Sequence, residues 1–134
     1  MVMKKTSTFE DLVVWQKCRD LRKTMSSMVK TLPAGERTRL ADQILRASRS
    51  VTANIAEGYG RFHYQENIQF CRQARGSLYE LLDHLSVSAD EGYIKLDEFE
   101  DVRNEIAEAV KLLNGYVAYL KKEKSDHQVA SQPT

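Results

Sequence analysis

The chain has 134 residues, of which 42% are hydrophobic, 29% are charged, six are glycine and two are proline. This length fits one domain, and the composition excludes a disordered, a collagen-like or a disulfide-rich protein. The formal net charge is +1, but residues 1–75 hold 14 Lys or Arg against seven Asp or Glu, whereas residues 76–134 hold six against twelve. A near-neutral total therefore hides a chain with two oppositely charged halves.

The first predicted helix begins near Thr8 and ends before Leu32-Pro33. Thr8 can cap its N-terminus, with Asp11 three residues later completing the cap. The apolar side chains recur at intervals of three and four residues, which is helical spacing; they are Leu12, Trp15, Cys18, Leu21, Met25, Met28 and Leu32. Residues 1–8 are expected to form an N-terminal extension.

The second predicted helix runs from about Glu36 to Glu57, and Gly58-Tyr59-Gly60 ends it. Its apolar face holds Leu40, Ile44, Ala47, Val51 and Ile55. The third predicted helix runs from about Tyr64 to Asp90, with Gly92 in the position that commonly follows a helix. Its core positions alternate strictly by three and four residues, with Arg75 as the one charged member; they are Ile68, Cys71, Arg75, Leu78, Leu82, Leu85 and Ala89.

The fourth predicted helix starts at Asp97 as N-cap, with Glu100 completing a capping box. It carries Phe99, Val102, Ile106, Leu113, Val117 and Leu120, and fades at Lys121-Lys122. Residues 123–134 are polar without periodicity, so we expect a disordered tail. Four helices of similar length joined by short breaks predict an all-α, antiparallel, up-down-up-down four-helix bundle, one domain spanning residues 9–122.

Few residues suggest enzymatic chemistry, and we expect no enzyme, cofactor or metal site. Gly58-Tyr59-Gly60 follows a helix and lacks the third glycine of a dinucleotide-binding loop, and the three histidines are not clustered. Cys18 and Cys71 lie on apolar stripes and are expected to be buried free thiols, which favours the reducing cytoplasm. No apolar run is long enough to span a membrane.

The second helix carries a polar stripe beside its apolar face, formed by Gln43, Arg46, Ser50, Asn54 and Glu57. Such a stripe is either a solvated flank or a polar network at a seam between helices or subunits. Arg61 is four residues after Glu57, in the favourable order for an ion pair. Arg75, on the core stripe of the third helix, is a second candidate partner for Glu57, since a buried Arg needs a carboxylate.

Charged residues gather on separate faces. We predict a basic face formed by Arg19, Lys23, Lys30, Arg39, Arg46 and Arg49, and an acidic face formed by Glu98, Asp101, Glu105 and Glu108. The basic face could contact the phosphates of a nucleic acid, without base-specific recognition. Alternatively, it could meet the acidic face of a neighbouring subunit, head to tail, in a ring.

Four segments resemble the family named after proteins encoded in intervening sequences of 23S rRNA genes: FEDLVVWQK at 9–17, LADQILRAS at 40–48, SVTANIAEG at 50–58 with Gly60 and Arg61, and ARGSLYEL at 74–81. The resemblance implies a small cytosolic bundle that assembles as a ring, typically a homopentamer, without known catalytic activity. It also implies a fold similar to the accessory proteins of diversity-generating retroelements, which associate with nucleic acid and a reverse transcriptase. The polar stripe, Gly58 and Arg61 are motif positions of this family.

The leading hypothesis is therefore a homo-oligomeric, non-enzymatic bundle that acts in assembly or as a nucleic-acid-associated accessory protein. The alternative is a protein-interaction scaffold, in which the acidic face or residues 123–134 dock a partner such as a reverse transcriptase or another protein. The two hypotheses differ in whether a partner is lost on nuclease treatment.

Overall fold

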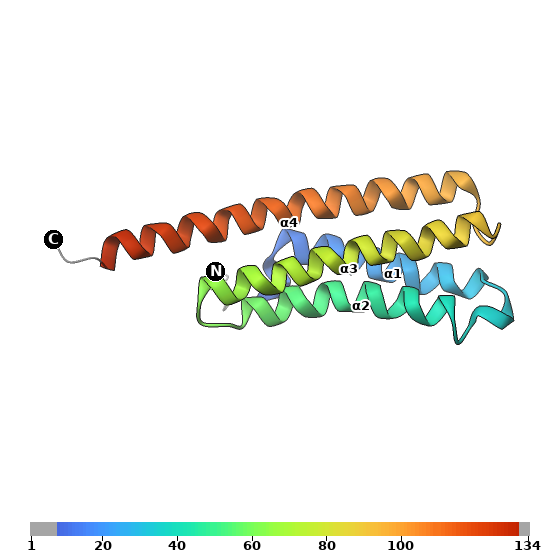
Figure 1. The fold of residues 1–134 in the computed structure, drawn as a ribbon, viewed down its shortest axis with the longest axis horizontal. Helices are drawn as coiled ribbons and strands as arrows, with labels where there is room; N and C mark the ends of the chain where they lie inside the picture. The colour runs from blue at the N-terminus through green and yellow to red at the C-terminus, as the bar shows by residue number, and fades with distance from the viewer. Residues whose placement is uncertain (1–7, 132–134) are drawn as a thin grey trace, which may run out of the picture.

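The computed structural model of the chain describes residues 8–131, with side chains for residues 8–128. Four long helices form one antiparallel, up-down-up-down bundle (Figure 1), as predicted: α1 (Val13–Met28), α2 (Leu40–Tyr59), α3 (Tyr64–Asp90) and α4 (Leu96–Ser131). Both α1 and α3 pack against α2 and α4, so that the four apolar faces close one core. None of the helices described is both long and apolar enough to cross a membrane.

The chain enters the bundle through a short 3-10 helix, η1 (Phe9–Asp11). The predicted cap is present: the Thr8 hydroxyl accepts a hydrogen bond from the Glu10 amide at 3.1 Å, and the Asp11 carboxylate accepts one from the Thr8 amide at 3.2 Å. The backbone is extended at Leu12, so the predicted continuous helix from Thr8 is broken there. Residues 1–7 of the predicted extension lie outside the described residues.

The connection from α1 to α2 contains two more 3-10 helices, η2 (Val29–Thr31) and η3 (Ala34–Glu36). Because Arg39 departs from helical geometry, α2 starts at Leu40 and not near Glu36 as predicted. At its other end α2 includes Gly58 and Tyr59, and Gly60 is the C-cap. Gly58 therefore does not end the helix; it is a buried residue within it.

α3 has the predicted bounds and ends in a Schellman motif. Gly92 has a φ of +76°, its amide donates to the Ala89 carbonyl at 3.0 Å, and the Tyr93 amide donates to the Ser88 carbonyl at 2.9 Å. The predicted role of Gly92 after the helix is confirmed.

α4 differs from the prediction at both ends. It begins at Leu96, where the Glu98 carboxylate accepts a hydrogen bond from the Lys95 amide at 3.1 Å, so the predicted capping box of Asp97 and Glu100 is wrong. It continues to Ser131, so the prediction of a disordered tail is wrong for residues 123–131. Residues 121–131 contain neither glycine nor proline, and Lys, Glu, Gln and Ala favour helix even without an apolar face.

The core of α3 is rotated relative to the prediction. Arg75, Leu82 and Ala89 were predicted to be core residues but are only half-buried. The buried residues of α3 are instead Asn67, Ile68, Cys71, Ala74, Leu78, Leu81, Leu85 and Ser88. Because α3 packs against both α2 and α4, its buried face is wider than a strict alternation of three and four residues describes. Arg75 consequently does not interrupt the core; Ala74 occupies that place.

Candidate functional site

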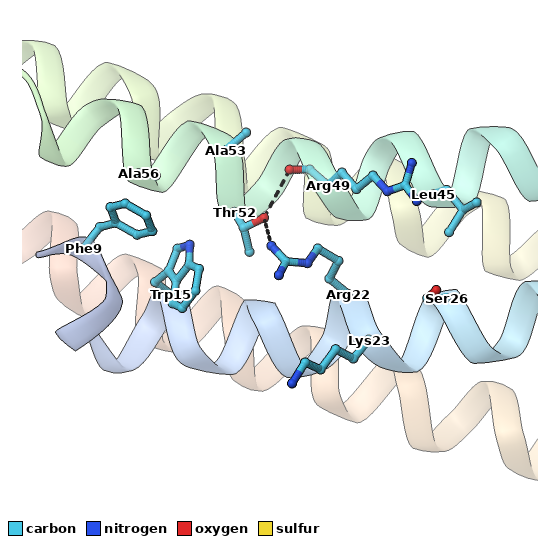
Figure 2. Close-up of a pocket in the computed structure, with 10 residues that line it drawn as sticks. All are labelled: Phe9, Trp15, Arg22, Lys23, Ser26, Leu45, Arg49, Thr52, Ala53 and Ala56. Atoms are coloured by element: carbon cyan, nitrogen blue, oxygen red, sulfur yellow. Dashed lines mark hydrogen bonds between the residues drawn. The ribbon is translucent and has the colours of Figure 1, made fainter.

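A groove runs along the surface between α1 and α2, with η1 at one end (Figure 2). Its volume is about 540 Å³, within the range of about 300–1,000 Å³ typical of sites for small ligands. The groove is lined by Phe9, Trp15, Arg22, Lys23, Ser26, Leu45, Arg49, Thr52, Ala53 and Ala56. Sequence positions more than 40 residues apart thus meet in one concave surface, which is the candidate site.

Three of the lining residues are cations, and none is a carboxylate. Arg22 crosses the groove from α1, and its Nη1 donates a hydrogen bond to the Thr52 hydroxyl on α2 at 2.9 Å. Lys23 lies on the α1 rim and Arg49 along the α2 rim (Figure 2), and neither forms an ion pair within the described part of the chain. The groove therefore carries unneutralised positive charge.

An aromatic pair forms the end of the groove beside Ala56 (Figure 2). The rings of Phe9 and Trp15 meet edge to face, with centroids 5.1 Å apart. The indole nitrogen of Trp15 points toward α2 and donates no hydrogen bond to any of the described residues. An indole N–H, guanidinium groups and an ammonium group can only donate, so the groove suits a ligand rich in acceptor oxygens.

The structure brings only part of the predicted basic face into this groove. Lys23 and Arg49 line it, whereas Lys30, Arg39 and Arg46 are exposed outside it. Arg46 forms an ion pair with Asp42 at 3.0 Å. The predicted face is thus divided between the groove and exposed positions in η2 and at the start of α2.

Arg19 also lies outside the lining, in an ion pair with Asp20 at 3.4 Å and 5.5 Å from the centre of the Trp15 ring. Sequence reasoning missed Arg22 and the aromatic end of the groove. A signal was available, since Arg22 follows Trp15 by two helical turns and so shares its flank of α1.

The polar stripe of α2 divides into a buried and an exposed part. Ser50 bonds to Ser77 of α3 at 2.9 Å, and the Asn54 amide donates to the Ser50 carbonyl at 2.9 Å, which places these residues in the seam between the two helices. Gln43, Arg46 and Glu57 are exposed.

The proposed pairing of Glu57 with Arg75 is wrong. Glu57 instead pairs with Arg61 at 2.9 Å, the other partner the sequence suggested. Arg75 is only half-buried and donates to the Asn114 side chain of α4 at 2.8 Å, so it needs no carboxylate.

The acidic face lies on the flank of α4 that adjoins α1. Glu108 pairs with Lys17 of α1 at 3.1 Å, Glu105 is half-buried, and Glu98 and Asp101 are exposed. Because Arg22 of α1 contacts α2 on the other side, α1 separates the acidic face from the groove. The charge segregation of the sequence thus persists on the surface.

A second surface feature lies where α2 turns into α3. Phe62 is 91% exposed and Tyr119 of α4 is 55% exposed. They line a smaller hollow of about 240 Å³ together with Tyr59, Arg61, His63, Tyr64, Asn67, Tyr116 and Leu120. Aromatic residues in such number are typical of protein contacts.

The cysteines take no part in either surface. Cys18 and Cys71 are buried free thiols, and burial raises their pKa to about 12 and about 11, above the ordinary value near 9. Within residues 8–128, no group of His, Cys, Asp or Glu side chains is arranged to hold a metal ion.

Comparisons with known proteins point to one family. A family model described as 23S rRNA-intervening sequence protein matches residues 10–115. A similar solved structure is a protein of unknown function from the S23 ribosomal protein family of Bacteroides thetaiotaomicron, with a TM-score of 0.72 and 25% identity over 78% of this chain and 98% of that one. No curated protein matches the chain significantly.

Proposed function

The chain belongs to the 23S rRNA-intervening sequence protein family, and from that premise we propose that it is a non-enzymatic, homo-oligomeric bundle that binds nucleic acid through phosphate contacts in the α1–α2 groove. The observation that carries the proposal is the set of three cations, Arg22, Lys23 and Arg49, in a groove whose lining holds no carboxylate. Local charge decides phosphate binding, so a net charge of +1 is no obstacle.

The test is a titration with RNA and with DNA at about 50 mM and about 200 mM salt. We expect binding at the lower concentration that weakens steeply at the higher, and at least about tenfold weaker binding by Arg49→Glu. Arg72 on the exposed surface of α3 provides the matched control, Arg72→Glu, which we expect to bind more like the wild type. Absence of binding at the lower salt concentration would refute the proposal.

Catalysis has no part in this proposal. The groove offers donors and apolar surface but no His, Asp, Glu or Cys that could act as a general base or nucleophile. The buried free thiols suit the reducing cytoplasm, where we place the protein.

Assembly is the second part of the proposal, supported by the separation of charges around α1. We propose that the acidic face, represented by Asp101 and Glu105, contacts the outward residues Arg39 and Arg46 of the next subunit, together with the exposed polar residue Gln43. Such a contact joins two different surfaces head to tail, and we propose that the rotation between subunits closes it into a ring. The family resemblance favours a pentamer.

Light scattering at micromolar concentration tests the assembly. We expect a molar mass several times the 15.4 kDa of the chain, reduced in the double variant Asp101→Lys, Glu105→Lys. The control is Asp83→Lys, on the exposed surface of α3. A wild-type protein of 15.4 kDa would refute self-assembly without affecting the nucleic-acid proposal.

A protein-interaction scaffold is the alternative, favoured by the exposed aromatic side chains of Phe62 and Tyr119. Its partner would be a protein such as a reverse transcriptase, docked at this end of the bundle or on the acidic face. Co-purification that survives nuclease and is lost in Phe62→Ser would favour the scaffold over the nucleic-acid proposal.

A further inference from the structure

The α1–α2 groove combines two kinds of surface that a simple phosphate contact does not need. The Arg22 guanidinium lies in its middle, the Arg49 side chain runs along α2 toward Leu45, and Lys23 extends from the α1 rim, while Phe9, Trp15 and Ala56 form an apolar end (Figure 2). A polyanion held by charge alone would leave this apolar surface in water. The ligand that fits carries a planar apolar group beside its negative charge.

We propose that the groove holds one unstacked nucleotide of a single-stranded nucleic acid, an inference that rests on the proposed function. The phosphate lies against Arg22, between the rims that carry Lys23 and Arg49, and the base lies against Phe9, Ala56 and the edge of Trp15. The groove is a single-strand site, because the bases of a duplex are stacked and cannot enter a groove between two helices.

The geometry of Arg22 supports this division of the groove. Its guanidinium is held by Thr52 at 2.9 Å and lies 5.9 Å from the centre of the Trp15 ring, so it is fixed between the charged middle and the aromatic end. The indole N–H of Trp15 remains available as a donor on the same side. These two groups can bind the phosphate and an acceptor atom of the sugar or base together.

Trp15 is the only tryptophan of the chain, so its fluorescence reports occupation of the groove directly. Three probes of equal length separate the contributions: a single strand, its duplex, and the same strand with abasic sites, which keeps every phosphate but lacks bases. We expect the single strand to change the fluorescence of Trp15 and to bind at least about tenfold more tightly than the abasic strand.

Variants at the apolar end test the position of the base. Phe9→Ala should reduce single-strand affinity while leaving abasic-strand affinity unchanged, and Phe62→Ala is the control for loss of an aromatic ring outside the groove. If Phe9→Ala does not fold, Ala56→Leu serves instead, because the larger side chain fills the same end of the groove.

The outcomes separate the inference from the function on which it rests. Equal binding of all three probes, weakened by Arg49→Glu, would refute the nucleotide site and leave phosphate binding in place. No binding of any probe at about 50 mM salt would refute the proposed function itself. If Arg49→Glu lowers the molar mass of the assembly and wild-type Trp15 does not respond to the single strand, a neighbouring subunit occupies the groove and the inference is wrong.

Discussion

Gly58 lies where the backbones of α2 and α3 approach each other closely. A Cβ atom at this position would lie 2.7 Å from Asn67 Oδ1 and 2.9 Å from Phe70 Cβ, both on α3. Asn67 is itself buried, and its amide donates to the Tyr116 hydroxyl of α4 at 3.1 Å. Because Gly58 has no side chain, α2 and α3 can pack closely here, and space remains for the Asn67 side chain, which reaches α4.

We predict that Gly58→Ala destabilises the protein by about 1–3 kcal/mol, because the added methyl group must displace Asn67 or Phe70. Gly76→Ala is the matched control, since that glycine also lies within a helix but a Cβ there would have no neighbour within 4 Å. The control should gain about 0.5–1 kcal/mol from helix propensity. Urea denaturation measures both, and equal effects would contradict the proposed close approach.

Because of its two buried thiols, the protein should lose stability at alkaline pH. Burial raises the pKa of Cys18 to about 12 and of Cys71 to about 11, while the nearby charges of Lys17 and Arg75 lower them only in part. Between pH 9 and 11 the unfolded chain releases these protons and the folded chain keeps them. The contribution of the two thiols to the free energy of unfolding is therefore fully present below pH 9 and is lost as the pH rises toward the raised pKa values.

We therefore predict that the free energy of unfolding falls by about 1 kcal/mol per cysteine at pH 10 relative to pH 8. Burial raises the pKa of the Tyr116 hydroxyl as well, so the wild type has a further contribution of the same sign. Comparing the free energy of unfolding of the wild type with that of Cys71→Ala at each pH isolates the contribution of the Cys71 thiol. A variant with the same pH slope as the wild type would contradict this account.

The last turns of α4, beyond Leu120, have no apolar face packed against the core among their described side chains. Beyond Leu120 its described contacts with α3 are polar or peripheral: Lys124 Nζ donates to Gln65 Oε1 at 2.7 Å, and the His127 ring lies 5.2 Å from that of Tyr64. Exposed contacts of this kind contribute little to stability. Helix propensity, more than burial, accounts for this segment.

We predict that a chain ending at Lys122 loses helical signal in circular dichroism but less than about 1 kcal/mol of stability. The core residues Val117 and Leu120 remain in place in the shortened chain. Its thermal midpoint should therefore lie within a few degrees of the wild type. A large fall in the midpoint would indicate that residues 123–131 pack in a way their polar contacts do not suggest.

At the scale of the whole molecule, the arrangement of charge matters more than its sum. The acidic face lies on the flank of α4 beside α1, whereas Arg39 and Arg46 are exposed at the start of α2, so each subunit offers two oppositely charged surfaces in different places. Contacts between such surfaces depend on ionic strength, whereas contacts between aromatic side chains depend on it much less.

We predict that the molar mass of the assembly falls as salt is raised from about 0.1 M to about 1 M, since the screening length shortens from about 10 Å to about 3 Å. The variant Phe62→Ser should keep the wild-type mass at low salt. A mass that is constant with salt but reduced in Phe62→Ser would place the subunit contact at the aromatic end of the bundle instead.

Spacing of apolar residues is a local property, and it predicted the four helices and the bounds of α3, while the short connections predicted their antiparallel order and the position of Gly92 predicted its role. The errors occurred where local rules compete. Leu12 and Arg39 break the helical runs, and α4 continues past its last apolar residue because helix propensity suffices there. On α3, contact with two helices widened the buried face beyond the predicted stripe.

By itself, the sequence determined an all-α bundle, its segregated charges and a polar stripe on α2. Only the tertiary structure decided which polar groups meet: Ser50 with Ser77, Arg75 with Asn114, and Arg22 with Thr52. The α1–α2 groove is likewise a feature that only the tertiary structure decided. Helical periodicity assigns each residue to a face, but the packing of α1 on α2 selects which faces adjoin, and a site shared by two helices exists only after that selection.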